Sequence, residues 1–222
     1  MIAFIQVSAE LKSLGPALSL ANKIRAVKQH DQGAVGLILV AKRPPIGEIG
    51  DVQIKRVPLW PPRFLSILYP FVIKHLLRNI GPITALILRP DFPNPLMKLV
   101  FRRRPFKLVT EHHSLLADEV SAVWKLPRRL TGAAWSSWQG MANQVTDGKV
   151  CLTNEIARSE QFAGQTLVLG NPVSPQISRE SSSRKRKANY LRICSVVSRD
   201  YPWHGHDRLL KSALSWVRED PE

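Results

Sequence analysis

The sequence has few cysteines and no metal-binding signature. Its only two cysteines, Cys151 and Cys194, both lie in apolar stretches typical of strands. This usage excludes a disulfide framework, and no Cys or His residues have the spacing of a zinc site. We therefore expect a reducing compartment and no metal cofactor.

Long apolar runs and acidic residues are also scarce. No stretch approaches the roughly 20 apolar residues of a membrane span, and residues 1–7 lack the basic lead of a signal peptide. These features predict a cytoplasmic chain. The sequence has only 17 Asp and Glu residues but 32 Lys and Arg residues, which gives a net charge of +15. Such an excess favours anionic partners, namely nucleic acid, a phospholipid surface or a phosphorylated substrate.

Short apolar runs alternate with helical segments along most of the chain. The run 34–40 is continuously apolar, as in strands buried on both faces of a parallel sheet. After Gly15-Pro16, apolar residues recur at helical spacing from Leu18 to Val27. The pattern predicts an α/β fold with a Rossmann-like, doubly wound parallel sheet. The strands we expect are 3–7, 34–40, 52–57, 85–88, 106–110, 148–152 and 166–169.

The pattern breaks at a polar, basic stretch and then restarts. Residues 178–189 contain Arg184-Lys185-Arg186-Lys187 and have no apolar periodicity, which predicts a linker. A nuclear-localisation or nucleic-acid-binding segment is the alternative. We expect a first domain over 1–177 and the start of a second Rossmann-like domain over 190–222. Since only one strand, loop and helix follow the linker, we expect this second domain to be incomplete.

The first candidate site is the run from Thr110 to His113, where an expected strand ends. Open α/β sheets bind ligands at that end of their strands. A histidine there, such as His112, can hydrogen-bond a sugar hydroxyl or share a proton near neutral pH. The alternative is a structural histidine. Because adjacent side chains point to opposite faces of a sheet, at least one of the two histidines is expected to be structural.

The second candidate site is the loop from Arg199 to Arg208. Arg199 follows a strand, and Gly205 allows close approach of the backbone before a helix begins. An arginine, a second cationic group and a helix N-terminus together suit a diphosphate. A metal site is not favoured, because Asp207 follows His206 immediately and no further histidine follows.

A third feature is the helical segment 63–80. One face of this helix is expected to be an apolar stripe, interrupted at Pro70, and the opposite face is polar apart from Ile67 and Phe71. The stripe comprises Phe64, Leu65, Leu68, Tyr69, Val72, Ile73, Leu76, Leu77 and Ile80, and the polar face comprises Lys74, His75, Arg78 and Asn79. An ordinary helix packed on the sheet is the favoured interpretation. The alternative is a basic amphipathic surface that rests on an anionic membrane, and the nearby Arg102, Arg103 and Arg104 add charge in its favour.

Four short sequence motifs together resemble those of the GT-B glycosyltransferases of the large retaining family 4. A strand ends in Thr110-Glu111-His112, and a later strand leads through Thr153 into a helix. An Asn171-Pro172 turn then precedes the linker. The second domain opens with a strand, Arg199, and the phrase 204–210, His-Gly-His-Asp-Arg-Leu-Leu. Order and spacing match across roughly the whole chain.

The resemblance implies transfer of a sugar from a nucleotide donor with retention at the anomeric carbon. By this resemblance Arg199 contacts the donor diphosphate, His112 touches the transferred sugar, and Gly15 lies in the glycine-bearing loop after the first strand. His204 and Gly205 belong to the donor side, with His204 where the family usually has lysine. The family commonly has two glycines near Gly15 and a Glu-x7-Glu phrase; one glycine is present, and the phrase is absent.

Two hypotheses follow. In the first, the chain is a cytoplasmic glycosyltransferase, truncated and impaired as it stands, that uses a nucleotide-sugar donor and a polysaccharide or lipid-linked acceptor. Its basic face would rest on the inner membrane; it needs no cofactor or metal, and nucleic acid is not an expected partner. In the second, the chain is a noncatalytic basic module. It binds anionic lipid or nucleic acid through Arg102–Arg104 and Arg184–Lys187.

Overall fold

The computed structural model of the chain describes residues 1–8, 10–11, 14–44, 46–62, 64–90, 93–113, 128–159 and 162–169, with the backbone alone over 128–135. All of them belong to Met1–Ser174, the first of two compact units of the chain. The expected linker 178–189 and second domain 190–222 lie outside the described residues.

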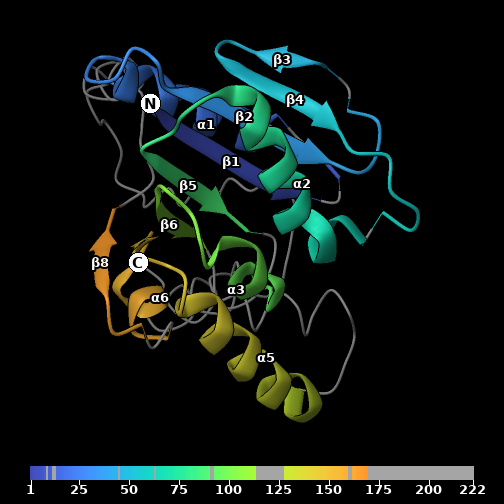
Figure 1. Cartoon of the computed structure of the whole chain (residues 1–222), viewed down its shortest axis with the longest axis vertical. Helices are drawn as coiled ribbons and strands as arrows, with labels where there is room; N and C mark the ends of the chain where they lie inside the picture. Colours follow the sequence, from blue (N-terminus) through green and yellow to red (C-terminus); the bar gives the residue numbers. More distant parts are fainter. Residues whose placement is uncertain are drawn as a thin grey trace, which may run out of the picture. The chain divides into compact units, whose positions relative to one another are not determined.

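The described residues form an eight-stranded, mostly parallel sheet (Figure 1). Its strand order is β3-β4-β2-β1-β5-β6-β7-β8, and every neighbouring pair is parallel except β3 and β4. The predicted α/β, Rossmann-like fold is confirmed. The strands are β1 (Ile2–Ser8), β2 (Val35–Val40), β3 (Glu48–Ile49), β4 (Val52–Arg56), β5 (Ala85–Arg89), β6 (Lys107–His112), β7 (Gly148–Cys151) and β8 (Gln165–Val168).

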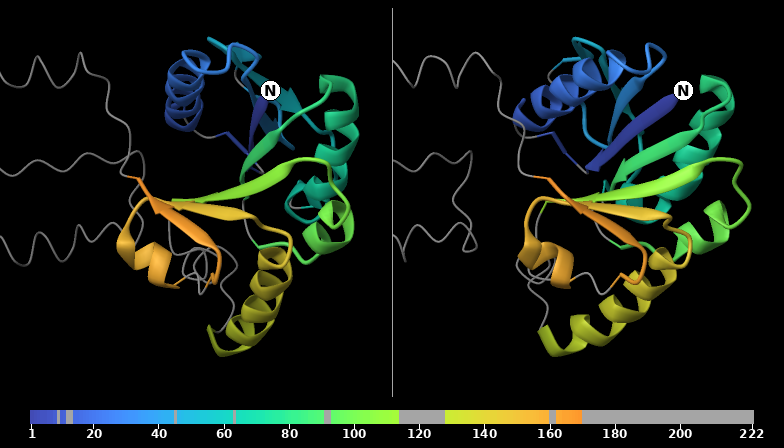
Figure 2. Two further views of the ribbon diagram at one scale, coloured as in Figure 1. Left: turned by 60° about the vertical axis from the view of Figure 1, so that its left-hand side comes forward. Right: turned by 90° about the vertical axis from the view of Figure 1, so that its left-hand side faces the viewer.

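Helices cover both faces of the sheet. The described helices are α1 (Gly15–Lys28), α2 (Phe64–Ile80), α3 (Leu96–Phe101), α5 (Arg128–Asn143) and α6 (Asn154–Ser159). Figure 2 shows α2, α3 and α5 on one face, with α1 and α6 on the other. Within the described part of the chain, no helix is long and apolar enough to cross a membrane.

Strand order places a switch point beside β1. The chain moves from β1 to β2 and β4 on one side, then crosses through α2 to β5 on the other side of β1. The connections on the two sides therefore diverge where β1 and β5 end. In open α/β sheets this divergence leaves a crevice in which ligands bind.

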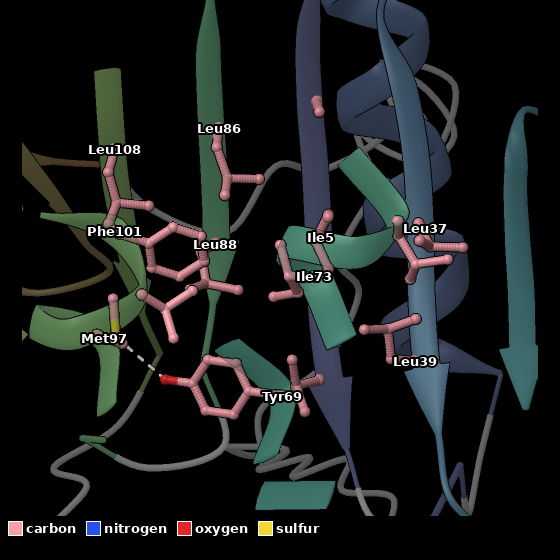
Figure 3. Close-up of a cluster of buried hydrophobic side chains, with 14 of the residues drawn as sticks. Ile5, Leu37, Leu39, Tyr69, Ile73, Leu86, Leu88, Met97, Phe101 and Leu108 are labelled. Carbon is pink, nitrogen blue, oxygen red and sulfur yellow. Dashed lines mark hydrogen bonds between the residues drawn. The ribbon is translucent and has the colours of Figure 1, made fainter. Parts of the chain in front are cut away.

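One hydrophobic core lies beneath α2 and α3. Figure 3 shows Tyr69 and Ile73 of α2 against Leu39 and Leu88 of the sheet. The buried Tyr69 hydroxyl donates a hydrogen bond to the Met97 sulfur of α3, at 3.1 Å. A buried phenol needs such a partner, so this contact ties the two helices together inside the core.

The other core lies beneath α1, where a glycine permits close packing. A Cβ at Gly36 of β2 would lie 2.9 Å from Val52 Cγ2 and 3.0 Å from Ile24 Cγ1. Both neighbouring side chains are fully buried. Gly36 therefore lets α1 sit directly against the centre of the sheet.

Helix α2 covers nearly all of the predicted helical segment 63–80, and its buried face differs from the prediction only in part. The helix continues through Pro70, where the Asn94 side chain donates to the Ser66 carbonyl at 3.0 Å in place of the N–H that proline lacks. Leu65, Tyr69, Ile73 and Leu76 are buried, as predicted. Phe64 and Leu68, which were also predicted to face the core, are exposed.

Candidate functional site

The candidate site lies at the carboxyl-terminal end of the sheet, beside the switch point. Gly15 opens α1 a few residues after β1 ends, and Thr110, Glu111 and His112 form the end of β6. The connection from β1 to α1 and the end of β6 therefore share the end of the sheet where ligands are expected.

His112 and His113 point to opposite faces, as strand alternation predicts. His112 is only 6% exposed, and its Nε2 lies 3.0 Å from the Thr110 hydroxyl on the same face. On β7, Cys151 is its register partner. The hydroxyl contact holds the imidazole ring of His112 in one orientation.

His113 belongs to a buried charged cluster with Glu111 and Lys23. Glu111 Oε1 accepts a hydrogen bond from Lys23 Nζ of α1 and contacts His113 Nε2. The Glu111 side chain is 7% exposed, while Lys23 and His113 are mostly covered. The cluster ties α1 to the end of β6.

The cluster sets the charge state of its members. Burial raises the pKa of Glu111, but the hydrogen bonds from His113 and Lys23 and the positive charge of Lys23 outweigh burial and lower that pKa to about 2. Burial lowers the pKa of His113, and the nearby charge of Arg89 adds to the effect against the attraction of Glu111. At neutral pH, Glu111 is therefore ionised and His113 is neutral.

The cluster leaves little room for a substrate. The space beside it is about 10 Å³, lined in part by Gln6, Lys23, Arg89 and Glu111. A space of this size holds at most a single water molecule. This cavity therefore cannot hold a substrate, and among the described residues the role of the cluster is to fix α1 against the end of β6.

Sequence reasoning missed Lys23 and Arg89. Lys23 lies beside the apolar stripe of α1, one residue before the buried Ile24. Arg89 follows Ile87 on the same face of β5. The position of Lys23 beside a buried stripe could have indicated a partly buried charge. Its partner Glu111 could not be identified from the sequence, because it lies 88 residues away.

A second feature lies at the opposite, amino-terminal end of the sheet. Lys74 and Arg78 of α2 line a hollow of about 410 Å³ together with Arg103 and Arg104, between Phe101 and Phe106. The structure thus brings together two basic segments that the sequence analysis singled out separately. Arg102 is exposed close by but does not line this hollow. We call this feature the basic hollow.

Arg104 is the most firmly held of these cations. Its guanidinium donates to the Phe101 carbonyl at 2.9 Å and pairs with the Asp147 carboxylate. The side chain is 13% exposed. Burial raises the pKa of Asp147, but hydrogen bonds from the Leu108 N–H and from Arg104 lower it overall. Arg104 therefore has a structural partner, whereas Arg103 is exposed to solvent.

The remaining predicted site residues, Arg199, His204 and Gly205, lie outside the described residues, as does the Asn171-Pro172 turn. In the part of the chain that the structure describes, no group of three or more His, Cys, Asp or Glu side chains could hold a metal ion. No protein-family model matches the chain, and no curated protein matches it.

Proposed function

We propose that this chain contains the acceptor-side domain of a retaining GT-B glycosyltransferase. It takes part in moving a sugar from a nucleotide-diphosphate donor to a saccharide or lipid-linked acceptor. One observation carries the proposal: the Thr110-Glu111-His112 phrase ends β6, one strand from the switch point between β1 and β5. Ligands of open α/β sheets bind at this place.

In this proposal the residues at the site have distinct roles. His112, oriented by Thr110, hydrogen-bonds a hydroxyl of the transferred sugar. The α1 N-terminus at Gly15 borders the acceptor. Arg199 contacts the donor diphosphate and offsets the charge that develops on the leaving group, with His204 and Gly205 beside it. The Lys23–Glu111–His113 cluster holds α1 in a fixed position against the end of β6.

A noncatalytic anion-binding module is the second candidate. The basic hollow favours it, because Lys74, Arg78 and Arg103 converge there from separate segments. In that case a nucleic-acid or anionic polymer would bind in a strongly salt-dependent way, since each phosphate contact releases counterions.

Nucleotide-sugar binding separates the two candidates. We expect the full chain to bind a member of a panel of UDP- and GDP-sugars, measured by calorimetry and by NMR of labelled histidines. Arg199→Ala and His112→Gln should each weaken that binding by about tenfold or more, since a hydrogen bond to a charged group is lost in the first case and a sugar contact in the second. His30→Gln, an exposed histidine after the end of α1, is the matched control and should change nothing.

Two other results would count against the proposed sugar transfer or its site. Salt-sensitive binding of RNA or DNA, without binding of any nucleotide sugar in the panel, would favour the module. Nucleotide-sugar binding that is indifferent to both Arg199→Ala and His112→Gln would refute the proposed site.

A further inference from the structure

The outer face of α2 is unusually apolar. Trp60 is 87% exposed just before the helix, and the helix then presents four more large apolar side chains to solvent. These are Phe64 (46%), Ile67 (37%), Leu68 (37%) and Phe71 (45%). We call these five residues the apolar stripe. Scattered exposed apolar residues are ordinary, but four along one helix face with a fifth just before the helix are typical of a surface that binds a protein or a membrane.

The fold does not need this stripe. The opposite face of α2 already packs on the sheet through Leu65, Tyr69, Ile73 and Leu76. Figure 2 shows α2 lying on the outer side of the sheet, in the layer it shares with α3 and α5. Among the described residues, the stripe thus has no part in the core of the domain and is available for contact with a partner.

Basic side chains follow the apolar stripe along the same helix. One turn after Phe71, the same outer face of α2 becomes basic at Lys74, His75 and Arg78. Lys74 and Arg78 enter the basic hollow, to which the next segment adds Arg103. A single surface thus passes from aromatic and aliphatic side chains to a group of cations.

We propose that this surface docks on an anionic phospholipid bilayer. The apolar stripe enters the boundary between headgroups and acyl chains, and Lys74, Arg78 and Arg103 bind lipid phosphates. Charge complementarity selects this occupant: cations beside an inserted apolar row match the surface of an anionic leaflet, and the chain carries a net charge of +15.

The direction of α2 determines which part of the docking surface lies near the candidate site. The helix starts near the carboxyl-terminal end of the sheet, after β4, and ends near its amino-terminal end, before β5. Its apolar half is therefore the half closer to the candidate site. A bilayer on this surface would bring lipid-linked molecules to the end of the sheet that carries His112.

Vesicle sedimentation tests the proposal directly. We expect the full chain to bind vesicles of phosphatidylcholine with 30% phosphatidylglycerol and to bind pure phosphatidylcholine at least tenfold more weakly. Each cation near an anionic surface contributes roughly a fivefold factor, so Arg78→Gln with Arg103→Gln should weaken binding by about 25-fold. Phe64→Ser with Phe71→Ser should weaken it by at least about tenfold, because both rings lose apolar contact.

Matched variants on the other side of the sheet serve as controls. Arg25→Gln with Arg56→Gln removes two exposed charges from α1 and from the α1 side of β4, and Leu18→Ser removes an exposed apolar side chain from α1. We expect less than a threefold change from either. Circular dichroism checks that every variant remains folded, as substitutions at exposed positions should.

Three outcomes overturn the proposal. The first is that the folded chain does not bind anionic vesicles. The second is that the two-charge control variant loses as much binding as Arg78→Gln with Arg103→Gln. The third is that binding does not weaken in 0.5 M salt. Sedimentation velocity tests the alternative that the stripe binds a second copy of the chain. Self-association that Phe64→Ser with Phe71→Ser abolishes, without vesicle binding, would make the stripe an interface between copies of the chain. No nucleotide sugar enters these measurements, so the docking surface and the proposed sugar transfer fail separately.

Discussion

Asn94 should be one of the most sensitive positions in the domain. It lies between β5 and α3, is 1% exposed, and bonds both to α2 and to the start of α3. Its amide Nδ2 donates to the Ser66 carbonyl at 3.0 Å and to the Ile67 carbonyl at 2.6 Å, and its Oδ1 accepts from the Leu96 N–H at 2.9 Å. Asn94→Ala removes all three hydrogen bonds.

The cost of Asn94→Ala follows from Pro70. Ordinary helical residues would supply a donor to the Ser66 carbonyl from position 70, but proline has no N–H. Each hydrogen bond contributes about 1 kcal/mol net, and a buried carbonyl deprived of its donor costs somewhat more. We therefore expect Asn94→Ala to lower the free energy of unfolding by about 3 kcal/mol.

A double-mutant cycle isolates the reason. Pro70→Ala restores an N–H that can donate to the Ser66 carbonyl, so Asn94→Ala should cost about 1 kcal/mol less in the Pro70→Ala background. Urea denaturation followed by circular dichroism measures all four proteins. Asn79→Ala, at an exposed position of the same helix, is the control and should stay within about 0.5 kcal/mol of the parent. Additive costs for Asn94→Ala and Pro70→Ala, or a loss below about 1 kcal/mol for Asn94→Ala, would refute the reasoning.

Two further predictions concern acid stability and packing. The pKa of Glu111 is about 2 against its ordinary 4.5, so its carboxylate stabilises the folded state by about 3 kcal/mol above pH 4.5 and loses this effect as the pH falls toward 2. Urea midpoints between pH 7 and 2.5 check this; Glu111→Gln should flatten that decline, and Glu48→Gln, an exposed carboxylate of β3, should not. Gly36→Ala should cost about 1–3 kcal/mol, because its methyl group meets fully buried side chains. Gly148→Ala is the control in thermal denaturation, since its methyl group finds only ordinary contacts, and an equal loss from both variants would contradict the packing argument.

The strands were predictable because their signal is local. The run 34–40 is continuously apolar and corresponds to the buried β2, and the predicted strand 106–110 corresponds to β6, which extends two residues further, to His112. Antiparallel β3 was missed, since two residues are too short for any alternation. The predicted helix over 63–80 formed, but the donor that replaces the missing N–H of Pro70 could not be predicted, because it comes from Asn94, 28 residues from Ser66. The roles of Arg199, His204 and Gly205 stay predictions.

The α/β class and the alternation of strands with helices could be predicted from the sequence, because periodicity depends on residues that are neighbours in the chain, and the excess of positive charge follows from composition. Which distant residues meet became visible in the folded domain alone. Lys23 finds Glu111 88 residues away, and Lys74 and Arg78 join Arg103 around one hollow, because the order of strands in the sheet differs from their order in the chain. The same packing left Phe64 and Leu68 of α2 exposed, although their spacing put them on the predicted buried stripe.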